Sequence, residues 1–196
     1  MTADHHTAVE ETLFRALNVD GGRLMDALAV VLSARGFGVA AGAIVVAVIA
    51  IVAGRRRRGL LVGFAVALAM SDFLGARVLR PLFGRTRPCF ALPAGSVRWL
   101  APASDVGSLP SLHAANFFAM ALVAWAADRR LGIAALAVAA AVSLSRVYVG
   151  VHWPTDVLAG AAWGAVCAFT ALAVARRAVG PAPGAGEASG PRGEGE

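Results

Sequence analysis

The chain has 196 residues, of which 58% are hydrophobic, and it carries a formal net charge of +6. Its mean hydropathy of +0.69 exceeds that of an ordinary water-soluble domain, so the composition excludes that class and predicts one membrane-embedded domain. All basic residues are arginines, and they lie at the edges of apolar segments, which favours lipid headgroups over nucleic acid as partners.

Apolar runs of about twenty residues recur along the chain, and each is long enough to cross a hydrocarbon core of roughly 30 Å. They predict an all-α fold, namely a polytopic membrane helix bundle with about five transmembrane helices. Two short N-terminal segments, 8–17 and 23–33, are predicted to be interfacial helices. The crossings are predicted, in chain order, at 36–53, 59–79, 113–127, 131–149 and 155–175.

These elements divide the chain into an N-terminal interfacial segment at 1–35, a transmembrane domain at 36–178 and a tail at 179–196. The tail is rich in Gly, Pro, Ala and Glu and is expected to be disordered. Small residues at Gly160 and Gly164 permit close helix contact, within one subunit or between two. The oligomeric state stays open at this stage.

Alternation of the crossings places the arginine-rich turns at 55–58, 129–130 and 176–177 on one face of the membrane. Three polar motifs then fall together on the other face. The dense run at 55–58 favours the first face as cytoplasmic, so the motifs are expected to face outward.

The first motif runs from Arg80 to Arg87-Pro88. A guanidinium group presents two parallel donors that match two phosphate oxygens, so this spacing is typical of a phosphate site. The alternative is that Arg80, Arg87 and the neighbouring Arg77 and Arg85 simply anchor a helix end in the interface.

The second motif is Pro110-Ser111-Leu112-His113, which directly precedes an apolar helix. Ser111 is a suitable N-cap, and the free N–H groups of a helix start can bind an anion. His113 would project from the first turn, close to such an anion. The alternative is a capping serine beside an incidental histidine.

The third motif joins Ser145-Arg146, His152 and Asp156. Pro154 suits the first turn of a new helix. Because Asp156 lies four positions after His152, it can accept the Nδ1–H of His152 and leave Nε2 as a nucleophile. The alternatives are a capping aspartate with an interfacial histidine, or a metal site. A metal is disfavoured because the arginines would repel a dication and the ligands are too few, so no cofactor is expected.

Taken together, the three motifs resemble those of the type 2 phosphatidic acid phosphatase (PAP2) superfamily in order and spacing. The family pattern is Lys, six residues, Arg-Pro; then Pro-Ser-Gly-His; then Ser-Arg, five residues, His, three residues, Asp. Two positions depart from it. Arg80 replaces the lysine in a chain without any lysine, and Leu112 replaces the glycine, which puts one backbone contact to phosphate in doubt or narrows the pocket.

The resemblance implies the membrane branch of that fold and a division of roles. His152 would attack phosphorus and form a phosphohistidine, His113 would protonate the leaving oxygen and then activate water, and Asp156 would orient His152. The residues that it assigns to phosphate binding are Arg80, Arg87, Ser111, Leu112 and Arg146.

The implied function is a metal-independent lipid phosphatase or diphosphatase with a lipid phosphate as substrate. Polyprenyl diphosphate, phosphatidic acid and phosphatidylglycerophosphate are the candidate substrates, and a bacterial carrier-lipid diphosphatase is the first expectation. Two alternatives remain open: a phosphotransferase, and a catalytically silent protein that binds or transports lipid phosphates.

Overall fold

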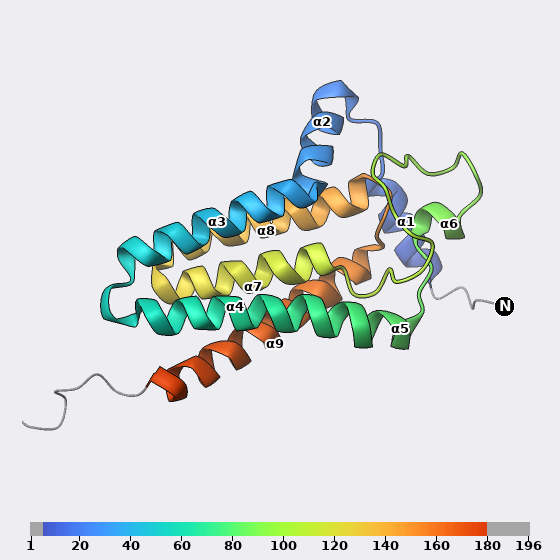
Figure 1. Cartoon of the computed structure of the whole chain (residues 1–196). Coiled ribbons are helices and arrows are strands. Elements are labelled where there is room, and N and C mark those ends of the chain that lie inside the picture. Colours follow the sequence, from blue (N-terminus) through green and yellow to red (C-terminus); the bar gives the residue numbers. More distant parts are fainter. Residues whose placement is uncertain (1–5, 180–196) are drawn as a thin grey trace, which may run out of the picture.

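The computed structural model describes residues 6–179, and every regular element in that range is helical (Figure 1). The central helix, α7, packs against α8, α9, α4 and α3. The predicted all-α class is confirmed. The elements are, in chain order, α1 (Ala8–Leu17), α2 (Gly22–Ser33), α3 (Arg35–Val52), η1 (Gly54–Arg56), α4 (Arg57–Leu74), η2 (Gly75–Leu79), α5 (Arg80–Phe83), α6 (Pro88–Ala91), α7 (Leu112–Ala127), α8 (Arg129–Tyr148) and α9 (Pro154–Val179).

The predicted helix boundaries agree with these to within a few residues, because long apolar runs bounded by charged or Gly/Pro-rich turns define a helix clearly. At the C-terminus, α9 continues to Val179. The predicted disordered tail otherwise lies outside the described residues.

Four of the five predicted crossings have the length expected of a membrane span, and the fifth is a shorter apolar helix. Four helical stretches are long and apolar enough to span a membrane, at Arg35–Val52, Gly54–Ala91, Arg129–Tyr148 and Pro154–Arg177. The expected third crossing, α7, has 16 residues and gives only about 24 Å of helix. Because α7 is largely buried among its neighbours, it contacts protein more than lipid, and the bilayer thickness does not fix its length.

The two helix starts that carry His113 and Asp156 are held tightly together. A Cβ atom at Gly160 or Gly164 of α9 would overlap the backbone carbonyl of Ser111 or of Ala115 in α7. The close contact allowed by these glycines is therefore made within one subunit.

Both ends of the bundle follow the predicted alternation. The turns between α3 and α4 and between α7 and α8 lie at one end, together with the end of α9 (Figure 1). The elements α1, α2, α5 and α6 and the segment that leads into α7 lie at the other end. All three polar motifs are at this second end.

Two local features shape the first motif. A π-helical turn, Gly75–Leu79, follows α4 and directly precedes Arg80, and turns of this kind are frequent at functional sites. Pro88 begins the short helix α6, and Arg87 precedes it in an extended conformation. A proline fits there because the first helical N–H has no partner within the helix.

Candidate active site

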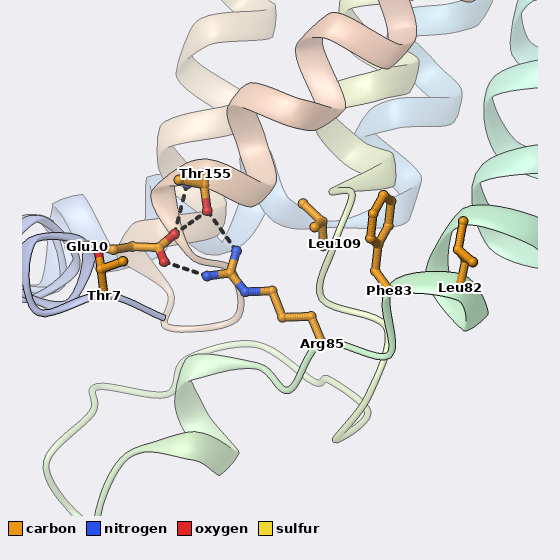
Figure 2. A pocket seen from close by; sticks show the side chains of 7 residues that line it. All are labelled: Thr7, Glu10, Leu82, Phe83, Arg85, Leu109 and Thr155. Atoms are coloured by element: carbon orange, nitrogen blue, oxygen red, sulfur yellow. Dashed lines mark hydrogen bonds and ion pairs between the residues drawn. The ribbon is translucent and has the colours of Figure 1, made fainter. Parts of the chain in front are cut away.

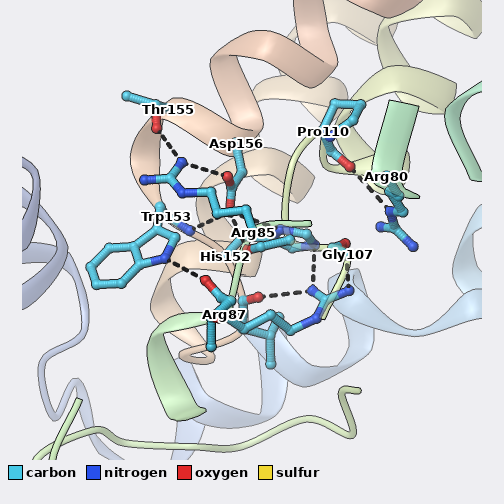
Figure 3. Close-up of polar contacts among 12 residues, drawn as sticks. Arg80, Arg85, Arg87, Gly107, Pro110, His152, Trp153, Thr155 and Asp156 are labelled. Atoms are coloured by element: carbon cyan, nitrogen blue, oxygen red, sulfur yellow. Dashed lines mark hydrogen bonds and ion pairs between the residues drawn. The ribbon is translucent and has the colours of Figure 1, made fainter. Parts of the chain in front are cut away.

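Arg80 and Arg87 of the first motif, Pro110 of the second, and His152 and Asp156 of the third lie close together (Figure 3). Electrostatic interactions join His113 and Arg146 to this group. Arg80 begins α5, Arg87 precedes α6, and Arg146 lies in the last turn of α8. The short link from α8 to α9 carries His152, and the first turn of α9 carries Asp156.

His152 lies between a cation and an anion. Arg87 Nη1 is 2.9 Å from His152 Nε2, and Asp156 Oδ2 is 3.3 Å from His152 Nδ1 (Figure 3). Because a guanidinium group can only donate, Nε2 must accept, so the ring proton lies on Nδ1 and is directed to Asp156. This is the tautomer that the sequence motif predicts.

His152 is 1% exposed. Burial lowers the pKa of His152 to about 3 from the ordinary 6.5, against the opposing effect of its hydrogen bond with Asp156. The imidazole is therefore neutral at physiological pH, and Nε2 keeps the lone pair that a nucleophile needs.

Asp156 is fully buried and accepts hydrogen bonds from several groups besides His152. The backbone N–H of Trp153 donates at 2.9 Å, and Arg85 Nη1 donates at 2.7 Å. The hydroxyl of Ser108 also donates to it at short range. These donors hold the carboxylate in one orientation and stabilise its charge.

Backbone carbonyls fix the two arginines of the first motif. Arg87 donates to the carbonyls of Val151, at 2.9 Å, and Gly107, at 3.2 Å, and Arg80 Nε donates to the carbonyl of Pro110 at 3.3 Å (Figure 3). Each guanidinium retains further donors for an anion.

Arg146 is a third cation of the site. It lies within electrostatic range of both His113 and His152. Its Nη1 donates to the carbonyl of Ser33 at 3.1 Å, and the backbone of Ser33 also bonds His113. The end of α2 therefore positions two groups of the site.

Several buried polar atoms in the described part of the chain have no hydrogen-bond partner, and three of them belong to predicted phosphate-binding residues. They are Ser111 Oγ and the Nε atoms of Arg87 and Arg146. Ser111 occupies the N-cap position of α7, but its side chain makes no capping bond there. Unsatisfied donors near a helix start suit a phosphate group, which supplies several acceptor oxygens.

Leu112, at the position where the family pattern has glycine, is 8% exposed. Its side chain packs against Gly75, where an added Cβ would clash with Leu112 Cδ2. The leucine therefore fills space between α7 and the π turn after α4.

Four residues contribute to the site without having been assigned to it from the sequence. Arg85 and Ser108 bind Asp156, Ser33 binds Arg146, and Glu10 binds Arg85. One signal was available for Glu10: it shares the buried side of α1 with Phe14, four residues later. The other contacts join positions far apart in the chain, which spacing alone does not reveal.

No group of three or more His, Cys, Asp or Glu side chains that could hold a metal ion occurs within residues 6–179. Cys89 and Cys167 are free thiols.

The family model described as PAP2 superfamily matches residues 58–179, which is more than half of the chain. The chain belongs to the PAP2 superfamily. The matched range contains every site residue predicted from the sequence. It begins after α1, α2 and α3, so Glu10 and Ser33 lie outside it.

Three bacterial relatives of this PAP2 chain match it over part of their length. Bacitracin transport permease protein BcrC of Bacillus licheniformis is 30% identical over 114 residues, covering 58% of this chain and 55% of that protein. Lipid A 4'-phosphatase of Bacteroides thetaiotaomicron is 34% identical over 106 residues, covering 52% and 47%. Putative undecaprenyl-diphosphatase YbjG of Escherichia coli is 38% identical over 108 residues, covering 53% and 51%. The chain spans about half the length of these relatives.

Two solved structures share the fold. LpxE of Aquifex aeolicus superposes with a TM-score of 0.69 at 23% identity, covering 88% of this chain and 99% of that chain. The PAP2 type phosphatidylglycerolphosphate phosphatase of Bacillus subtilis gives 0.67 at 24% identity, covering 88% of each chain. Both likenesses support the helical arrangement described above.

Proposed function

We propose that this PAP2 chain is an integral-membrane lipid phosphatase or diphosphatase that acts through a phosphohistidine. The observation that carries the proposal is the setting of His152, a buried neutral imidazole with Nδ1–H directed to Asp156 and Nε2 directed to Arg87. This is the arrangement of a nucleophile whose orientation and charge are controlled by its neighbours.

In the first step, the phosphoryl oxygens replace His152 as the acceptor of the Arg87 Nη1 hydrogen bond. The freed Nε2 lone pair attacks phosphorus in line, a P–N bond forms, and the P–O bond to the leaving group breaks. His113 supplies the proton that the departing oxygen takes. Positive charge develops on the imidazole of His152, and the carboxylate of Asp156 stabilises it.

In the second step, water attacks the phosphohistidine. His113 accepts the proton of this water, the P–N bond breaks, and inorganic phosphate is released with His152 neutral again. Arg80, Arg87 and Arg146 hold the phosphoryl oxygens in both steps, because electrostatic positioning is the main contribution to phosphoryl transfer. In this scheme the arginines carry the charge stabilisation, so it needs no metal ion.

The substrate is a membrane lipid that carries a phosphate ester or diphosphate. The chain has helices able to cross a membrane, and its site lies at one end of them, so a headgroup can enter while its chains remain in the bilayer. The similarity to a putative undecaprenyl-diphosphatase favours a polyprenyl diphosphate as the first substrate to test. The arginine-rich turns at the opposite end favour an outward-facing site.

The test is phosphate release by the purified protein in detergent, with polyprenyl diphosphate, phosphatidic acid and phosphatidylglycerophosphate supplied separately. We expect release from at least one of them. Absence of release from all three would contradict the proposal.

A second measurement addresses the intermediate. With an aryl phosphate, whose leaving group needs no proton, His113→Asn should accumulate a phosphoenzyme that is stable in base and labile in acid. His152→Asn should accumulate none. A phosphoenzyme of the same stability in His152→Asn would contradict the assignment of the nucleophile.

A further inference from the structure

The helix α1 precedes the region that matches the family, yet it contributes a buried carboxylate beside the site. Glu10 is 6% exposed and lies on the same side of α1 as Phe14, which is completely buried. Phe14 packs on Trp153, the neighbour of His152, with ring centroids 5.3 Å apart. A carboxylate buried to this degree needs a specific partner.

Glu10 has two partners, and both belong to the active-site end of the protein. Its carboxylate forms a short ion pair with Arg85, and it also accepts from the hydroxyl and, at 3.2 Å, from the backbone N–H of Thr155 (Figure 2). Thr155 directly precedes Asp156 in the first turn of α9.

Arg85 is shared between two carboxylates. It is 5% exposed, pairs with Glu10 through Nη2, and binds Asp156 Oδ1 through Nη1 at 2.7 Å. The same Nη1 binds Thr155 Oγ1 at 2.7 Å, and the guanidinium lies over the ring of Trp153, 5.6 Å from its centroid. The side chains therefore form one continuous row, Glu10–Arg85–Asp156–His152.

A cavity of about 580 Å³ lies beside one end of this row, with Glu10, Arg85 and Thr155 among its lining residues (Figure 2). Asp156 and His152, at the other end of the row, are not among the residues that line it. The ion pairs of Arg85 with Glu10 and Asp156 therefore connect the cavity wall to the buried His152.

We propose that Glu10 is a positioning residue for the phosphoryl-transfer reaction, acting on His152 through Arg85 and Asp156. The inference rests on the proposed function for its kinetic consequence, but the contacts stand independently of it. Glu10 balances the charge of Arg85 and fixes the direction of its Nη1 donor.

Charge division along the row gives the physical reason. Without the carboxylate of Glu10, Arg85 would lose one of the two carboxylates that it binds within residues 6–179, and the charge of Asp156 would be drawn more strongly toward Oδ1. Oδ2 would then accept the Nδ1–H of His152 less strongly. The positive charge that develops on His152 during attack would then be less stabilised, so kcat falls. Substrate binding is retained, because Glu10 is not one of the phosphate-binding residues.

The first test compares Glu10→Gln with Glu11→Gln. These changes are chemically identical and adjacent in α1, but Glu11 pairs with Arg15 at the surface. We expect Glu10→Gln to lower kcat about 10- to 100-fold with KM within about threefold of wild type. Glu11→Gln should retain the wild-type values. Wild-type kcat in Glu10→Gln would overturn the proposal.

The second test separates positioning from simple anchoring of α1. If Glu10 acts through Arg85, Glu10→Gln should have no further effect on kcat in a protein that already carries Arg85→Met. Glu10→Gln/Arg85→Met should then turn over at the rate of Arg85→Met. Multiplication of the two losses would show that Glu10 acts independently, which would overturn the proposed route.

The third test does not require turnover. In detergent, the Nδ1–H proton resonance of His152, assigned by its loss in His152→Asn, should move upfield in Glu10→Gln and stay unchanged in Glu11→Gln. An unchanged resonance in Glu10→Gln would overturn the positioning role. If the wild type hydrolysed no lipid phosphate, the proposed function would fail while this resonance still decided the inference.

Discussion

Replacing Leu112 by glycine restores the residue of the family pattern, and we predict that it acts mainly on stability. Leu112 is 8% exposed, and its side chain lies against Gly75. Removing a buried leucine side chain costs about 2–5 kcal/mol, with more lost where the site cannot collapse. The space that Leu112 fills is bounded by α4 and α9. Trp163 Nε1 of α9 donates a hydrogen bond to the carbonyl of Ser71 in α4 at 3.2 Å. Because this bond holds the two helices in place, we expect them to move little into the space left by the leucine.

The reciprocal change, Gly75→Ala, introduces a methyl group where Leu112 Cδ2 now lies. Because the obstructing atom is the end of a flexible side chain, the cost should be near the lower end of the ~1–3 kcal/mol found for overpacked sites. In the double variant the methyl group occupies part of the space that Leu112→Gly leaves. The two effects should therefore fall short of additivity by about 1–2 kcal/mol.

Thermal unfolding of the four proteins in detergent measures this cycle. For a chain of this length, 1 kcal/mol corresponds to a shift in Tm of about 2–4 °C. Phosphate release per folded molecule should change less than about tenfold in Leu112→Gly, because no group with catalytic chemistry is removed. Additive Tm shifts, or a larger loss of turnover at unchanged Tm, would refute the reasoning.

Three further predictions concern the reacting groups. His152→Ala should abolish phosphate release, and Asp156→Asn should lower kcat about 10²- to 10⁴-fold. Thermal unfolding should show that both variants are still folded. Near-normal phosphate release by His152→Ala would exclude His152 as the nucleophile. EDTA should leave phosphate release unchanged, and a loss that Mg²⁺ restores would contradict the metal-free scheme. Because the folded-state pKa of His152 lies below its unfolded value of 6.5, its contribution to stability is complete above that value and is lost as pH falls toward 3. Between about pH 7 and pH 5 the wild type should lose roughly 2 kcal/mol more stability than His152→Asn, and equal losses in a comparison of Tm values would contradict this.

The sequence by itself determined the helices and the groups that carry the chemistry. Apolar runs long enough to cross a bilayer, bounded by arginines or Gly/Pro-rich turns, have few alternatives to helices. In a bilayer the backbone N–H and C=O groups must form their hydrogen bonds within the segment. The short spacing of His152 and Asp156 predicted their contact, because Asp156 lies in the first turn of α9 and His152 lies in the link just before it.

Only the tertiary structure decided how those groups are supported. Glu10 and Arg85 are 75 positions apart, and Ser33 and Arg146 are 113 apart, so no local pattern encodes either contact. The packing of Leu112 against Gly75 and the uncapped hydroxyl of Ser111 likewise depend on where α4, α7 and α9 cross. Local periodicity specifies a helix and its faces. The partner of a buried charge depends instead on which oppositely charged residue lies beside it in the assembled bundle, because a buried charge is stable only when it is paired.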